Sequence, residues 1–202
     1  MANSTAVPPS NKRWATVSAR EQIRRRYFPD VTLTTHDGRK VRFYDDLIKD
    51  RCVMLNFMYA RCQGICSPTT MNLQRVQELL ADRVGRDIFM YSFTLKPEED
   101  SPADLLHYMK VRRIGPGWTF LTGAPHDLEL VRQRLGFTDP DPARDADKTN
   151  HTGMVRYGNE GRQLWAAFPG MSSAEAIAKQ MTWVAWPDGV DKVGTGKLTS
   201  RG

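Results

Sequence analysis

The stretch VMLNFMYARCQGICSP, residues 53–68, decides the fold and contains a pair of cysteines. It begins with a short apolar run bounded by polar residues, which is the pattern of a buried central strand. It ends in Ser67-Pro68, a helix-capping side chain followed by a residue that favours the first helical position. Cys62 and Cys66 therefore lie at a turn from a strand into a helix. Free N–H groups at a helix start favour thiolates, so this pair can exchange with a disulfide or hold a soft metal ion.

The spacing of the two cysteines bears on that choice. Three residues separate Cys62 from Cys66, one more than in a Cys-x-x-Cys redox motif, and the wider loop leaves room for an ion between the sulfurs. Two thiolates suit linear Cu(I), whereas a third ligand, usually an imidazole, allows either oxidation state of copper. The remaining cysteine, Cys52, begins the apolar strand and is expected to be a small core residue.

Apolar periodicity along the chain predicts an α/β fold. A first hairpin is expected around 36–39 and a second around 158–161, because Asp-Gly and Gly-rich turns there separate strand-like segments. The expected strands are 31–34, 40–44, 52–58, 88–93, 118–121, 152–157 and 163–168, and the expected helices are 19–27, 68–84, 102–109, 127–135 and 174–184. Helices between apolar strands imply a sheet covered on both faces. We therefore expect a thioredoxin-like fold, a central mixed sheet with helices on both faces plus an N-terminal β-hairpin.

His151 is the predicted third ligand. It stands where a polar loop, 139–150, enters the strand expected at 152–157, and in thioredoxin-like architecture this strand entrance faces the cysteine turn. Thioredoxin oxidoreductases place a cis-proline there to guide the substrate backbone, but residues 149–152 read TNHT and contain no proline. The other histidines are expected at the surface or at a helix start: His36, His107 and His126. Four methionines that could approach the site are expected to pack in the core instead: Met54, Met58, Met71 and Met154.

Length and charge set the domain organisation. The 202 residues suit one domain with some decoration, and 40% hydrophobic residues suffice for a core. Residues 1–26 carry +5 of the formal charge of +6, so the rest of the chain is close to neutral, which argues against a nucleic-acid-binding domain. We expect a flexible basic N-terminal segment (1–26), a thioredoxin-like copper-binding domain (27–186) and a C-terminal tail (187–202). The basic segment is either a solvated arm or a surface for acidic lipid head groups or an acidic partner.

Four sequence blocks resemble the Sco/SenC family of copper-binding thioredoxin-fold proteins. The resemblance spans roughly Tyr27 to Trp186 and is carried by TLTTHDG at 32–38, the cysteine pair followed by TTMNL at 69–73, the block 92–102 with its LKPEEDSP end, and Asn150-His151-Thr152. It implies that Cys62, Cys66 and His151 are the copper ligands. It also implies delivery of Cu(I) or Cu(II) to the copper-receiving subunit of a respiratory cytochrome c oxidase or another cuproprotein, or prior reduction of that subunit's cysteines.

The resemblance further implies a location in the periplasm or on the outer face of the bacterial inner membrane, or in mitochondria. No secretory signal and no membrane span is seen in the sequence, so a signal or anchor is expected to lie outside it. The chain also departs from the family pattern: Gln63 and Ser67 replace prolines of Cys-Pro-x-x-Cys-Pro, and Lys96 replaces an aspartate. A basic Lys96 near the site would favour thiolates.

Two other functions remain open at this point. In a thiol-disulfide oxidoreductase, an enzyme acting on a partner's cysteines, Cys62 would attack and Cys66 would resolve the mixed disulfide. In a redox or copper sensor, the same residues would signal through a partner. The cysteines and His151 are compatible with all three functions.

Overall fold

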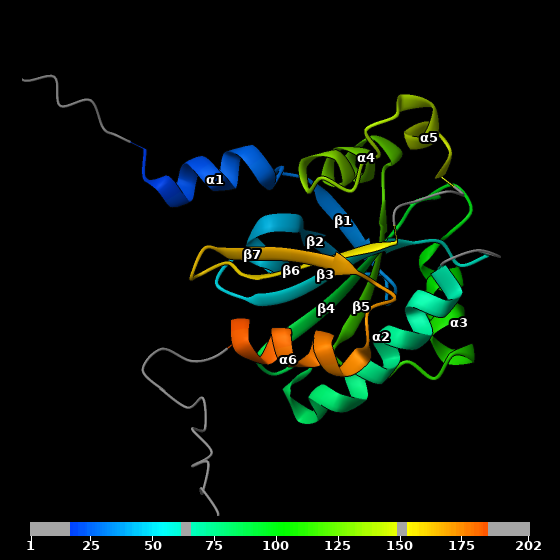
Figure 1. Ribbon diagram of the computed structural model, residues 1–202. Coiled ribbons are helices and arrows are strands. Elements are labelled where there is room, and N and C mark those ends of the chain that lie inside the picture. The colour runs from blue at the N-terminus through cyan, green and yellow to red at the C-terminus, as the bar shows by residue number, and fades with distance from the viewer. Residues whose placement is uncertain (1–16, 62–65, 149–152, 186–202) are drawn as a thin grey trace, which may run out of the picture.

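The computed structural model describes residues 17–61, 66–148 and 153–185 (Figure 1). Its elements, in chain order, are α1 (Ala19–Tyr27), β1 (Thr32–Thr35), β2 (Lys40–Arg42), the π-helix η1 (Phe43–Ile48), β3 (Cys52–Met58), α2 (Cys66–Leu80), the 3₁₀ turn η2 (Ala81–Arg83), β4 (Ile88–Thr94), α3 (Pro102–Val111), β5 (Trp118–Gly123), α4 (Pro125–Arg134), α5 (Pro142–Ala146), β6 (Met154–Asn159), β7 (Leu164–Pro169) and α6 (Ala174–Val184). No helix in these ranges is both long and apolar enough to cross a bilayer.

Seven strands form one mixed sheet in the order β2-β1-β5-β4-β3-β6-β7. The three central strands β3, β4 and β5 run parallel, and an antiparallel hairpin joins them on each side. β4 is the middle strand of the seven, and its neighbour β3 pairs in parallel with β4 and antiparallel with β6. The expected mixed sheet with helices is confirmed.

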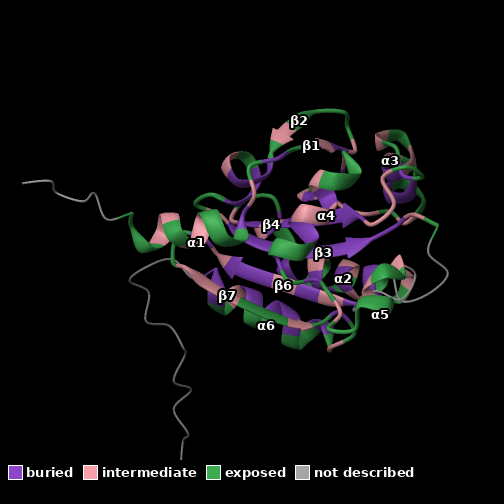
Figure 2. Ribbon diagram, turned by 90° about the horizontal axis from the view of Figure 1, so that it is seen from above, coloured by how far each residue is buried: buried purple, intermediate pink, exposed green. Residues whose placement is uncertain are grey.

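Two apolar cores lie on opposite faces of the sheet, because successive strand residues point to alternate sides. Met54 and Met58 of β3 pack in the core that α2, α3 and α6 cover. Val53 and Leu55 pack in the other core, under η1 and α4. All seven residues of β3 are buried, as its apolar run predicts, and β3 crosses the buried centre of the molecule in Figure 2.

The buried polar residues of the central strands satisfy one another. Ser92 of β4 donates to Asn56 Oδ1 at 2.6 Å and accepts a hydrogen bond from Trp118 Nε1 at 2.8 Å. Both Ser92 and Asn56 are buried. This chain of hydrogen bonds offsets the cost of placing polar groups in the core and fixes the register of three strands.

The structure differs from the expected elements at three points. The strand expected at 40–44 ends at Arg42, because η1 then turns four apolar side chains into the core. α2 begins at Cys66 rather than after Ser67. The polar loop expected at 139–150 contains the short helix α5, which Asp141 caps by accepting a hydrogen bond from the Ala143 N–H.

A buried carboxylate fastens α1 to the rest of the molecule. Arg20 of α1 donates to Glu160, which also accepts from Tyr44 Oη at 2.9 Å and from the Asp50 N–H at 2.8 Å. Burial alone would raise the pKa of Glu160, but these hydrogen bonds together hold it below its ordinary value. We call this group the Arg20–Glu160 latch. No α1 residue is itself buried, so these polar contacts supply much of what fixes the helix.

Candidate functional site

Of the three predicted ligands, the structure describes only the backbone of Cys66, so the site is described through the residues next to them in the chain. Cys62 and His151 lie outside the described residues, as does the side chain of Cys66. The backbone of Cys66 is described, and it is the first residue of α2. Backbone N–H groups in a first helical turn have no intrahelical acceptor, and with the helix dipole they favour an anion there.

The sheet brings the neighbours of these ligands to one edge. β3 ends at Met58, four residues before Cys62, and β6 begins at Met154, three residues after His151. The two strands are antiparallel neighbours, with Asn56 opposite Val155. The end of one strand and the start of the other therefore lie at the same edge.

A glycine packs the start of α2 against the start of β6. Gly170, just after β7, donates its N–H to the carbonyl of Gly153 at 2.8 Å. A Cβ on Gly170 would lie 2.6 Å from Thr69 Cγ2 and 2.8 Å from the Gly153 carbonyl oxygen. Asn72 of α2 holds the same turn by donating to the carbonyls of Gly170 and Ser172, both at 2.7 Å. Residues close in sequence to Cys66 and to His151 are thus in contact with one glycine.

Replacing Gly170 with alanine should therefore separate these two segments. The new methyl group would meet a backbone oxygen that cannot move alone, and overpacking of this kind costs about 1–3 kcal/mol. We expect a lower unfolding midpoint in urea and weaker Cu(II) binding in titration. Gly161→Ala, in the β6–β7 turn, is the matched control, because its Cβ would meet nothing closer than 3.6 Å. Equal metal affinities for the two variants would contradict this account of the packing.

A buried aspartate holds the backbone that leads to Cys62. Asp100 is 1% exposed, accepts from the Ala60 N–H at 3.1 Å and accepts from Thr94 Oγ1 at 2.5 Å. Burial raises the pKa of Asp100 above its ordinary value, against the opposing effect of these two hydrogen bonds. The sequence predicts no role for Asp100. Its place in the block 92–102, which follows a central strand to the same edge of the sheet, is the signal that points to it.

Two cations flank the same edge. The Lys96 Nζ lies 4.7 Å from the centre of the Tyr59 ring and 3.2 Å from Glu99 Oε1. Lys96 therefore lies beside the segment leading to Cys62, but its charge is shared with a carboxylate. Arg112, just after α3, donates to Ser67 Oγ at 2.8 Å, one residue after Cys66. This contact ties the first turn of α2 to the end of α3 and places positive charge near it.

On the other side of the edge, a buried arginine fastens the segment that leads to His151. Arg132 of α4 is 4% exposed and donates to Asp145 of α5 at 2.6 Å, to Glu129 at 2.7 and 2.9 Å and to the Phe137 carbonyl at 2.8 Å. Lys148 adds an ion pair to Glu129 at 3.2 Å. Hydrogen bonds from Arg132 lower the pKa of Glu129 and of Asp145 to about 2. We call this group the Arg132 cluster; it ends three residues before His151.

The other histidines lie apart from this edge or at the surface. His107 and His126 are exposed on α3 and α4, as expected. His36 is half-buried, contrary to the expected surface position: its Nδ1 accepts from the Phe120 N–H at 3.3 Å, and burial lowers its pKa. Within 17–61, 66–148 and 153–185, no three His, Cys, Asp or Glu side chains cluster as metal ligands would.

The sulfur-containing residues mostly pack as expected. Cys52 is a free, buried thiol whose pKa burial raises to about 12. Met54 and Met58 are buried in the core, and Met154 packs against the other core. Met71 corrects the expectation, because it is 62% exposed on the outer side of α2.

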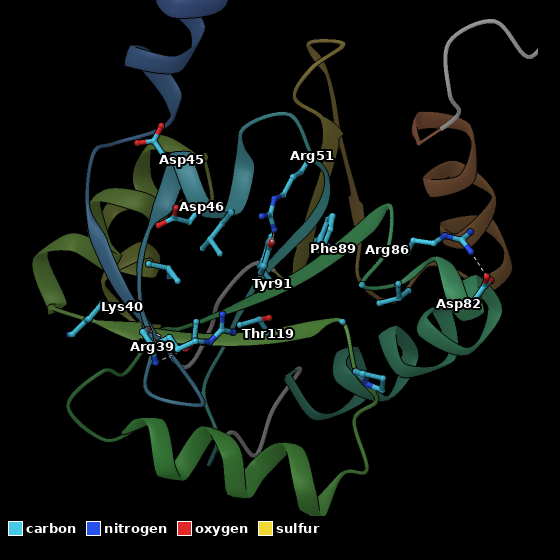
Figure 3. A pocket seen from close by; sticks show the side chains of 17 residues that line it. Arg39, Lys40, Asp45, Asp46, Arg51, Asp82, Arg86, Phe89, Tyr91 and Thr119 are labelled. Carbon is cyan, nitrogen blue, oxygen red and sulfur yellow. Dashed lines mark hydrogen bonds and ion pairs between the residues drawn. The ribbon is translucent and has the colours of Figure 1, made fainter.

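A cavity of about 1070 Å³ lies away from this edge of the sheet (Figure 3). It opens where β4 and β5 begin, whereas the cysteine segment follows the end of β3. In it, Arg86 pairs with Asp82, and Arg51 stacks on Phe89 at 4.6 Å. Nothing in this cavity matches a thiolate or imidazole site.

Comparison with known proteins bears on both fold and family. Residues 19–185 match the family model described as SCO1/SenC. A curated relative, the SCO1 protein homolog of Bacillus subtilis (strain 168), is 29% identical over 94 residues, which are 46% of this chain and 47% of the relative. The aligned region thus spans about half the length of that relative.

Solved structures share the fold. Bradyrhizobium japonicum ScoI with copper bound matches with a TM-score of 0.62 and 20% identity over 76% of this chain and 96% of its own. A SCO1/SenC family lipoprotein from Bacillus anthracis str. Ames matches with a TM-score of 0.62 and 20% identity over 77% and 93%. BsSco, described with a disulfide switch and as a member of the Sco family of cytochrome c oxidase assembly proteins, matches with a TM-score of 0.62 and 20% identity over 77% and 91%. The thioredoxin-like Sco fold is therefore confirmed.

Proposed function

Since the chain belongs to the SCO1/SenC family, we propose that it is a copper metallochaperone for the copper centre of a respiratory cytochrome c oxidase. The proposed ligands are the thiolates of Cys62 and Cys66 and the neutral imidazole of His151. Copper is the cargo of this protein, bound from a donor and released to a recipient. A related fold has been solved with copper bound, which supports the assignment of the metal.

One observation carries this proposal: Gly170 contacts both Thr69 and Gly153. Thr69 lies three residues after Cys66, and Gly153 lies two residues after His151. The segments that join Thr69 to Cys66 and Gly153 to His151 are only a few residues long, and they can therefore bring both ligands to one point. The donor set also fits the cargo, because soft thiolates bind Cu(I) and added imidazole accommodates Cu(II).

The chain's own residues prepare this site for binding and release. The N-terminus of α2 favours the thiolate of Cys66, and Asp100 orients the backbone before Cys62. The Arg132 cluster anchors the segment before His151. Release follows when thiolates of a recipient replace those of Cys62 and Cys66 one at a time, so that the metal always keeps soft ligands.

Anaerobic titration with Cu(I) tests the proposal. We expect saturation close to one equivalent per chain in competition with a Cu(I) chelator, because two thiolates form one two-coordinate site. The Cys62→Ser, Cys66→Ser double variant should lose this site. Cys52→Ser is the control and should retain it, because Cys52 is buried and its pKa is raised to about 12. A reduced, folded protein that takes up no Cu(I) would refute the assignment.

A second candidate is a thiol-disulfide oxidoreductase, which the disulfide switch described for BsSco favours. The Cys62 thiolate would attack a partner disulfide and form a mixed disulfide. Attack by Cys66 would then release the partner with two thiols and leave a Cys62–Cys66 disulfide. Insulin reduction by metal-free protein tests this candidate, with His151→Ala as the informative variant. Reductase activity that survives loss of Cu(II) binding would favour it over the chaperone.

The cellular setting completes the proposal. We place the thioredoxin-like domain on the outer face of the inner membrane, in the periplasm, because a protein of this fold is described as a lipoprotein. The expected recipient is the copper-receiving subunit of the oxidase or another cuproprotein. The basic N-terminal segment, 1–26, would add contact with a membrane surface.

A further inference from the structure

A cavity of about 470 Å³ lies between α1, α4 and β7. Its apolar lining includes Ile23, Tyr27, Phe28, Leu135 and Trp165. The rings of Phe28 and Trp165 are 5.1 Å apart, and Tyr27 is 41% exposed at the surface. We call this cavity the α1 groove. Its volume is within the range of small-molecule sites, roughly 300–1000 Å³.

Arginines without carboxylate partners surround the α1 groove. Arg134 and Arg156 line it, and Arg134 donates to the carbonyl of Arg26 at 2.9 Å. In the described part of the chain, none of these three guanidinium groups forms an ion pair, and no carboxylate lines the groove. Of the arginines elsewhere in the described residues, ten form ion pairs: Arg20, Arg24, Arg25, Arg39, Arg42, Arg75, Arg83, Arg86, Arg132 and Arg144.

Arg156 is the most constrained of the three. It is half-buried, donates to the Gly136 carbonyl at 2.9 Å and lies 5.6 Å from the centre of the Phe137 ring. Burial lowers its pKa, but a guanidinium stays charged in proteins. A partly desolvated cation without a counter-ion is costly, so an anion that reaches it gains from a charge-assisted hydrogen bond. The Trp165 Nε1 is also buried without an acceptor among the described residues.

We propose that the α1 groove binds an anionic phospholipid of a membrane surface, with its phosphate on Arg134 and Arg156 and its acyl chain along Phe28 and Trp165. A phosphate accepts two parallel hydrogen bonds from a guanidinium. Aromatic side chains beside cations are typical of surfaces that rest at the boundary between head groups and acyl chains. An acidic protein would match the charge but not the apolar wall.

Lipid binding there would orient the protein. α1 and α5 lie at opposite ends of the molecule in both views (Figures 1 and 2). α5 belongs to the segment that leads to His151. A protein resting on a bilayer through the α1 groove would therefore present its proposed copper end away from the lipid. The inference does not depend on copper and can fail or hold independently of the proposed function.

Flotation with lipid vesicles tests the inference on the full chain. We expect binding to phosphatidylcholine vesicles that contain about one third phosphatidylglycerol and little binding to phosphatidylcholine alone. The Arg134→Gln, Arg156→Gln variant should bind about 30-fold more weakly, since each arginine near the surface contributes about fivefold. The matched control is Arg75→Gln, Arg86→Gln, which removes the same charge from arginines already paired with Glu78 and Asp82. Equal losses in the two variants, or none, would overturn the proposal.

Quenching of tryptophan fluorescence by brominated acyl chains distinguishes lipid binding in the α1 groove from vesicle binding through the basic N-terminal segment. Tryptophan fluorescence should fall with brominated lipid, and the fall should shrink in Trp165→Phe. Vesicle binding without Trp165-dependent quenching would show surface attraction only and would overturn the proposal. Arg134→Gln alone keeps the test valid if Arg156→Gln fails to fold, because Arg134 is exposed. If inorganic phosphate bound the groove as tightly as the vesicles do, the acyl chain would contribute nothing, and this result would likewise overturn the proposal.

Discussion

Replacing His151 with alanine should weaken Cu(II) binding by more than about 100-fold, the upper end of what losing even an outer-shell partner costs. Cu(I) affinity should change far less. The physical reason is coordination number: two thiolates satisfy Cu(I), whereas Cu(II) prefers more ligands, nitrogen among them. Competition titrations of both ions, with the Cu(II) electron paramagnetic resonance spectrum as a second measurement, provide the check.

The chain offers a matched control for this variant. His126 is exposed near the start of α4, so His126→Ala should leave both affinities unchanged. If His151→Ala weakened Cu(I) and Cu(II) equally, or neither, the imidazole would not be a ligand. The proposed function would then rest on the two cysteines alone, and dithiol exchange would become the better account.

Replacing Arg132 with methionine should have the largest effect on stability. Methionine keeps much of the apolar stem but removes the cation that bridges Glu129 and Asp145, so that the cluster retains only the ion pair of Lys148 with Glu129. Removing one partner of a buried ion pair costs roughly 3–5 kcal/mol, and the lower figure applies here because both carboxylates keep some contact with water. Urea unfolding measures this loss. We also expect an altered Cu(II) spectrum, because the segment leading to His151 loses its anchor.

Acid titration gives this prediction a second signature. Arg132 holds the pKa of Glu129 and Asp145 at about 2, below their unfolded values, so their contribution is present above pH ~4 and is lost as pH falls toward 2. Arg132→Met should flatten the stability profile across this window. Arg83→Met is the control: it breaks an ion pair with Asp87 remote from the copper edge and should leave the Cu(II) spectrum unchanged. An altered spectrum in both variants would indicate general loosening instead.

The sheet could be predicted from sequence because its signals are local. The apolar run at 52–58 has the length and composition of a central strand, and the structure buries all of it. The predicted start of α2 is two residues late, since Ser67-Pro68 resembles a cap followed by a first helical residue. Proline fits elsewhere in a first turn too, because the N–H groups there have no intrahelical acceptors, so Cys66 can begin the helix.

The supports of the candidate site could not be predicted because their partners are distant in the chain. Asn72 reaches a carbonyl 98 residues away, and Asp100 reaches a backbone N–H 40 residues away. Gly170 shows no unusual pattern in sequence; its importance follows from atoms of two other segments that meet around it. Such contacts depend on the tertiary structure, whereas hydrophobic periodicity reports only which face of an element is buried.

The Arg20–Glu160 latch also determines how force travels through the molecule. A helix attached by a flexible joint would swing independently and absorb any pull applied to it. Here an ion pair with a carboxylate only 1% exposed couples α1 directly to the β6–β7 hairpin. Tension or torque on α1 is therefore transmitted to β6, whose other end leads back to His151, so that α1 and the sheet rotate together.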